Sequence, residues 1–158
     1  MTRRDLIPLL AAPLCRGGVP ALPTVDEAGF RKLVDSARGK VLLVDFWATW
    51  CAPCRAEMPQ LVKLSARLAP RGFRLVTISA DEPEKDAAAA EFLKQYGAPK
   101  PAYRKQAEDD DKFINSIDPK WGGALPALFL FDKSGRKVQS FIGEVPMTDV
   151  EAAVVKLL

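Results

Sequence analysis

Residues 41–54 read Val41-Leu42-Leu43-Val44-Asp45-Phe46-Trp47-Ala48-Thr49-Trp50-Cys51-Ala52-Pro53-Cys54. The run from Val41 to Phe46 is apolar except for Asp45, which suits a strand covered on both faces. The two cysteines follow where this strand ends and a helix is expected to begin. At a helix N-terminus, unpaired backbone N–H groups and the positive end of the dipole favour the thiolate, which is the form that attacks disulfides. The stretch therefore predicts dithiol–disulfide exchange by Cys51 and Cys54 through a mixed disulfide with a partner.

Two other interpretations of the cysteine pair are weaker. The chain has three cysteines and no histidine, and Cys15 lies far upstream, so a four-ligand zinc site would need carboxylates or a second chain. A purely structural disulfide would close so short a loop that it would restrain the unfolded chain little. We therefore expect redox chemistry that uses no metal and no cofactor.

The segment from Leu43 to Arg55 resembles the active-site signature of the thioredoxin family. Pro59 falls where that family kinks its active-site helix, residues 124–127 (Ala-Leu-Pro-Ala) resemble its cis-proline turn, and Gly143 resembles the glycine that closes a later strand. The chain is most similar to the bacterial extracytoplasmic TlpA/ResA-type thiol-disulfide oxidoreductases. The resemblance implies an α/β thioredoxin fold, in which helices flank a central mixed sheet. It also implies an insertion between the second central strand and the cis-proline strand.

Roles for three residues follow from their positions and from the resemblance. Cys51 comes first, nearest the helix end, and is expected to be the exposed nucleophile, while Cys54 is the resolving thiol. Asp45 lies in an apolar strand, where an ionised carboxylate is costly and the pKa should rise. The resemblance implies that Asp45 is buried and takes up the proton of Cys54. The alternative is an Asp45 that faces solvent at a strand end.

The resemblance also implies a substrate groove opposite the dithiol. In this family the cis-proline turn offers the backbone of the preceding residue, here Leu125, to an extended substrate strand. The expected substrate-binding residues are Trp50, Ala52, Pro53, Leu125, Pro126 and Gly143. Pro126 could instead be a trans proline at a strand start. Pro53 could simply be a favourable first-turn proline, although in the family it goes with a more reducing pair.

Length and composition fit one domain, which we place at residues 22–158. The chain has 158 residues, of which 48% are hydrophobic and 27% charged, so it can bury a single core. Strands are expected at 41–46, 73–79, 125–131 and 137–142. Thr148 and Glu151 are expected to form a capping box that opens the last helix. Trp121 is expected in the core, with a place on the groove wall as the alternative.

Residues 1–21 are interpreted as a signal peptide or a disordered N-terminal segment. Arg3 and Arg4 precede an apolar stretch at 6–14 that is too brief to span a bilayer, and residues 2–7 loosely resemble a twin-arginine export signal. Cleavage after Ala21 would suit the small-residue rule. This predicts a periplasmic or otherwise extracytoplasmic protein of a bacterium, and a cytoplasmic location is the alternative.

Charge and composition narrow the possible partners. The formal charge of +3 is spread along the chain without a basic stripe, so nucleic-acid binding has little support. We expect a monomer that reduces disulfide-bearing proteins, with apocytochrome c among the clients that the resemblance suggests, and that is recharged by an upstream thiol electron donor. The competing hypothesis is a binding or chaperone-like module in which the cysteines are dispensable.

Overall fold

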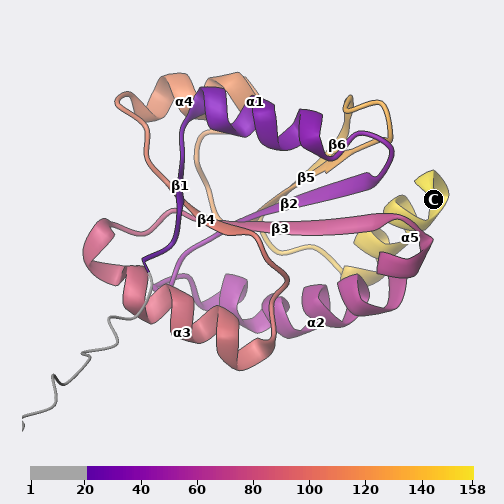
Figure 1. Cartoon of the computed structure of the whole chain (residues 1–158), viewed down its shortest axis with the longest axis horizontal. Coiled ribbons are helices and arrows are strands. Elements are labelled where there is room, and N and C mark those ends of the chain that lie inside the picture. Colours follow the sequence, from indigo (N-terminus) through magenta and orange to yellow (C-terminus); the bar gives the residue numbers. More distant parts are fainter. Residues whose placement is uncertain (1–20) are drawn as a thin grey trace, which may run out of the picture.

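The computed structural model describes residues 21–158, which form one six-stranded mixed sheet with helices on both faces (Figure 1). The strands are β1 (Thr24–Val25), β2 (Val41–Trp47), β3 (Phe73–Ser79), β4 (Ala102–Lys105), β5 (Ala127–Phe131) and β6 (Lys137–Ile142). The helices are α1 (Glu27–Ser36), α2 (Ala52–Leu68), α3 (Asp86–Tyr96), α4 (Asp110–Ile117) and α5 (Met147–Leu157), with short 3-10 turns η1 (Ala69–Arg71) and η2 (Pro83–Lys85). The expected leader at 1–21 lies, apart from Ala21, outside the described residues.

Strand β2 is the centre of the sheet, whose strand order is β1-β4-β3-β2-β5-β6. It pairs in parallel with β3 and antiparallel with β5, and all seven of its residues are buried. Because side chains alternate along a strand, Leu42, Val44 and Phe46 face α1 and α4, whereas Leu43 and Asp45 face the side of α2. Figure 1 shows the same two layers, with α1 and α4 on one face and α2, α3 and α5 on the other.

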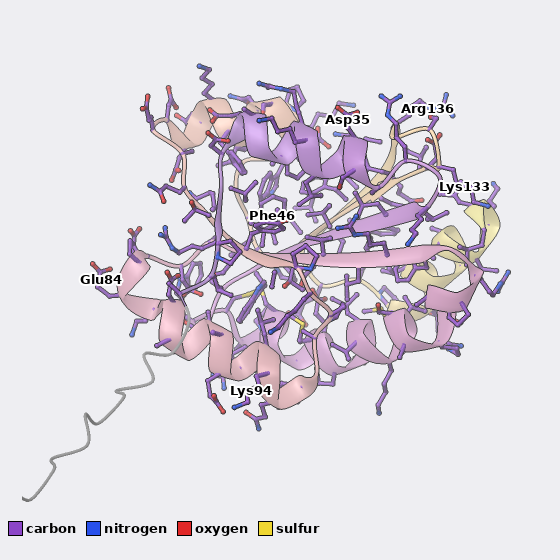
Figure 2. All side chains as sticks on the ribbon, viewed as in Figure 1. Asp35, Phe46, Glu84, Lys94, Lys133 and Arg136 are labelled. Carbon is purple, nitrogen blue, oxygen red and sulfur yellow. A yellow bond between two sulfur atoms is a disulfide. The ribbon has the colours of Figure 1, made fainter. Side chains whose placement is uncertain are left out.

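An aromatic cluster fills the core on the side of α1 and α4. The ring of Phe46 lies 4.9 Å from that of Trp121 and 5.8 Å from that of Phe129, measured between centroids. Trp121 is buried, and its indole N–H donates to the carbonyl of Ala124 at 2.8 Å. Trp121 is therefore a core residue, as expected, and it ties down the segment that leads into β5. Figure 2 shows Phe46 in the interior, while labelled charged side chains such as Glu84 point outward.

The predicted architecture is confirmed, and two predicted details are wrong: the strand expected at 125–131 begins at Ala127, after the cis bond to Pro126, and the last helix lacks the expected capping box. The insertion between β3 and β5 holds α3, β4 and α4. The last helix, however, begins at Met147 after Pro146 and has no side-chain cap. Thr148 lies inside its first turn, too late in the chain to act as the N-cap residue of a capping box. None of the helices within residues 21–158 has the length and apolarity needed to cross a membrane.

Candidate active site

The two cysteines lie at the N-terminus of α2, immediately after β2. Cys51 is the N-cap residue, and its Sγ accepts a hydrogen bond from the backbone N–H of Cys54 at 3.4 Å. The two sulfurs form a disulfide. Pro53 fits the first helical turn because that turn leaves its backbone N–H groups without intrahelical partners. The dithiol is thus held where helix geometry supplies unpaired donors to a sulfur.

Both cysteines are more enclosed than expected. Cys51 is 5% exposed and Cys54 is fully buried, so Cys51 is the more accessible residue but not an exposed one. They belong to an apolar cluster with Ala89 and Leu93 of α3. This helix belongs to the insertion, so part of the cluster in which Cys51 is buried comes from the insertion. Trp50, by contrast, is 69% exposed beside it.

Asp45 is buried and unpaired, which excludes the solvent-facing alternative. Its side chain is 1% exposed, and neither carboxylate oxygen has a hydrogen-bond partner. Burial raises the pKa of Asp45 well above its usual value, and the neighbouring Glu57 raises it further. Thr77, its Cα partner on β3, also holds a buried hydroxyl without a partner. A carboxyl in this setting favours the protonated form and is suited to exchanging a proton.

Glu57 is a buried acid that sequence reasoning missed as a site residue. It follows Cys54 by three residues on the inner face of α2, is 9% exposed, and has one carboxylate oxygen without a partner. Burial, and then the charge of Glu144, raise the pKa of Glu57 to about 7. The available signal was its spacing, because Cys54, Glu57, Leu61 and Leu64 follow the helical period of one face.

The structure brings together part of the expected substrate-binding set. The peptide bond between Leu125 and Pro126 is cis, and Leu125 packs against the cluster that holds both cysteines. Gly143 has a φ of +81°, and its N–H donates to the carbonyl of Pro126 at 2.8 Å. Trp50 and Ala52 are exposed and lie outside that cluster. Pro53 is half-buried in the first turn of α2.

A groove at the dithiol stays a prediction. Two cavities share the segment from Gln106 to Glu108, and the second is also lined by residues 80–83, which follow β3. Neither of them is lined by a cysteine or by Pro126.

Trp47 packs behind the active site. It is fully buried, and its ring stacks on Phe92 of α3 with centroids 5.1 Å apart. The guanidinium of Arg55, the residue after Cys54, lies 5.3 Å from the centre of the Phe92 ring. These contacts fix α3 against the first turn of α2 and therefore help to enclose the dithiol.

Comparisons with known proteins agree with this geometry. A family model described as Redoxin matches residues 13–157. The thiol-disulfide oxidoreductase ResA of Bacillus thuringiensis (strain Al Hakam) is 31% identical over 138 residues, which cover 87% of this chain and 75% of that protein. A thiol:disulfide interchange protein DsbE homolog of Paracoccus denitrificans is 39% identical over 133 residues, 80% of this chain and 67% of that protein. A solved thiol:disulfide interchange protein of Chlorobium tepidum superposes with a TM-score of 0.64 at 25% identity, covering 89% of this chain and 99% of that one.

Replacing Glu57 by Gln should change how stability depends on pH. The folded protein keeps the Glu57 proton up to about pH 7, whereas the unfolded chain releases it near the ordinary pKa of 4.5. The native state therefore binds more protons between these values, and the free energy of unfolding falls as pH rises through this window. Because the introduced amide stays neutral at every pH, Glu57→Gln should gain roughly 1–2 kcal/mol relative to the parent between pH 5 and 8, an estimate reduced for partial solvent screening.

Urea unfolding at several pH values measures this effect. Glu84→Gln is the control, because the side chain of Glu84 is exposed on η2. If the free energy of unfolding depends on pH in the same way for the parent and for Glu57→Gln, the raised pKa of Glu57 is contradicted.

Proposed function

The chain belongs to the Redoxin family, and we propose that it is a thiol–disulfide oxidoreductase that reduces protein disulfides through Cys51 and Cys54. The observation that carries this proposal is the disulfide itself, closed at the N-terminus of α2 directly after an exposed tryptophan. Its ResA and DsbE-type relatives carry thiol–disulfide names, which support the same chemistry.

The proposed reaction transfers two electrons in two exchanges. The Cys51 thiolate attacks one sulfur of the client disulfide, a mixed disulfide forms, and the other client sulfur leaves as a thiolate that takes up a proton. Cys54 then loses its proton and attacks the Cys51 sulfur, which releases the second client thiolate. The client is reduced and the Cys51–Cys54 pair is oxidised. An upstream thiol donor must return two electrons before the next turnover.

Asp45 is the proposed acceptor of the Cys54 proton. The chain has no histidine, and Asp45 faces the same side of the sheet as the helix that carries Cys54. Because the pKa of Asp45 is raised, it lies closer to the pKa of a thiol than an ordinary carboxyl pKa does, and this favours proton transfer between the two groups.

Reduction is the proposed direction because the one backbone donor bonded to a sulfur, the N–H of Cys54, is set in otherwise apolar packing. Met58 and Leu93 belong to the same buried cluster as both cysteines, and apolar surroundings disfavour a charged thiolate. Pro53 also removes one backbone N–H next to them. When the thiolate is poorly stabilised, the reduced form of the pair is less favoured, its reduction potential is lower, and the pair acts as a reductant.

We place this activity outside the cytoplasm. The support is the arginine-led apolar segment within residues 1–21. Disulfide-bearing clients persist in such an oxidising compartment, where a reductant needs its own electron supply.

Single-cysteine variants test the function. Cys51→Ser should lose turnover of a disulfide-bonded peptide, because the remaining thiol of the pair, Cys54, is fully buried. Cys54→Ser should accumulate a mixed disulfide between Cys51 and the peptide, since the resolving thiol is gone. Mass spectrometry of the non-reduced protein and peptide measures both the reduced peptide that is formed and the mixed disulfide. Cys15→Ser is the control. A Cys51→Ser protein that still acts on the peptide as the parent does would favour a binding module in which the cysteines are dispensable.

Asp45→Asn tests the proton acceptor. The resolving step should slow by roughly 100-fold or more near neutral pH, because general acid–base catalysis typically contributes about 10²- to 10⁴-fold. The initial attack by Cys51 should change little, because it does not use Asp45. Single-turnover rates measured from pH 6 to 9 check this, and rates equal to those of the parent across that range would remove Asp45 from the mechanism.

The reduction potential decides the direction. Equilibration with dithiothreitol, followed by tryptophan fluorescence, should give a value near that of thioredoxin, about −270 mV. Pro53→His should raise the potential, because it restores a backbone donor and adds a side chain that can carry positive charge. A parent value near −120 mV would make the protein an oxidant and contradict the proposed direction.

A further inference from the structure

A buried carboxylate outside the proposed reaction, Asp81, holds the loop that leads to Cys51. It follows β3 and is 4% exposed. Its two oxygens accept the backbone N–H of Thr49 at 2.9 and 3.2 Å and the hydroxyl of Thr49 at 2.7 Å. A further bond comes from the hydroxyl of Ser79 at 2.7 Å. Both oxygens of this carboxylate are therefore occupied, and most of these bonds go to one residue of the loop.

The neighbouring backbone reinforces this attachment. The N–H of Asp81 donates to Oγ of Ser79 at 3.0 Å, which fixes the carboxylate relative to its own backbone. The N–H of Ala80 donates to the carbonyl of Trp47 at 2.8 Å. The segment that leaves β2 is thus joined to the segment that leaves β3 at two successive points. Only Trp50 separates the second point, Thr49, from Cys51.

The hydrogen bonds to Asp81 are of a strong kind. Bonds to an ionised acceptor are shorter and about twice as strong as neutral ones, and burial strengthens them further. Ala48 and Cys51, at the two ends of the loop, are buried in one cluster, and the N–H of Cys51 donates to the carbonyl of Ala48 at 3.1 Å. Thr49 and Trp50 lie outside that cluster, so the bonds to Asp81 are what holds the middle of the loop and limits how far Cys51 can shift.

We propose that Asp81 is a positioning residue for the attack of Cys51 on the client disulfide. The inference rests on the proposed function, because attack at sulfur needs the three sulfur atoms in line, and a small displacement of the nucleophile costs rate. Asp81 accepts no proton in this reaction and contacts no client. It acts through Thr49, by holding the short loop in the conformation that presents Cys51.

Asp118 provides a matched control for loss of a buried carboxylate. It is also buried, accepts the hydroxyl of Ser140 at 2.7 Å and the N–H of Lys120 at 2.9 Å, and pairs with Lys137 at 2.8 Å. It follows α4, on the opposite side of the sheet from α2. A variant here should lose stability for similar reasons without disturbing the loop before Cys51.

The experiment compares Asp81→Ala, Asp81→Asn and Asp118→Ala in the full chain. The kcat/KM for a disulfide-bonded peptide should fall on the order of 10- to 100-fold in Asp81→Ala, at a temperature where all variants are folded. Asp81→Asn should recover part of the rate, because its amide oxygen can still accept the Thr49 N–H. Asp118→Ala should react at the parent rate. Equal losses in Asp81→Ala and Asp118→Ala would assign Asp81 to general stability and overturn the proposal.

Amide hydrogen exchange at Thr49 gives a readout that does not need turnover. The amide should be protected in the parent and exchange faster in Asp81→Ala, while Asp118→Ala keeps the protection of the parent. Unchanged protection in Asp81→Ala, or lost protection with a parent rate toward the peptide, would overturn the positioning role. A parent without Cys51-dependent turnover would contradict the proposed function instead, and the exchange of Thr49 would still decide whether Asp81 holds the loop.

Discussion

Strand β2 hydrogen-bonds to β3 on one side and to β5 on the other, and water reaches neither of its faces. This pairing fixes three segments at one end of the sheet. The chain leaving β2 reaches Cys51, the chain leaving β3 supplies Asp81, and the antiparallel register of Phe46 with Ala127 places Pro126 beside the end of β2. Residues far apart in the sequence therefore meet because their strands are paired, and the site inherits the rigidity of the sheet.

The same burial determines the chemistry. Among the described residues, neither Asp45 nor Glu57 forms an ion pair, although both lie on the side of the sheet that carries the dithiol. An uncompensated buried acid costs stability, and such groups concentrate where a protein performs chemistry. Asp81 differs from them, because both oxygens of its carboxylate accept hydrogen bonds and it fixes the backbone of the loop at Thr49. Buried acids around this dithiol thus have two different physical roles.

Much of the fold and the centre of the site could be predicted from sequence. The apolar run at 41–46 and the cysteine spacing are local signals, and the cis bond before Pro126 followed from a family resemblance. The burial of Cys51 was missed because it lies in a cluster that α3 helps to build, and no local pattern says where an inserted helix packs. Asp81 lies 32 residues from Thr49, so its role depends on a contact that only the folded sheet creates.

The sequence contains no histidine, the side chain that most often exchanges protons near neutral pH. Glu57 takes over that range because burial raises its pKa to about 7, and burial also raises the pKa of Asp45 well above its usual value. The folded state prefers them protonated, whereas an Asp45 that is to receive a proton must first be ionised. The most stable form of the domain is consequently not the form prepared for the resolving step. The pH of the surroundings therefore shifts the balance between two properties of the domain. A lower pH favours the more stable, protonated state, and a higher pH favours the ionised Asp45 that can accept a proton.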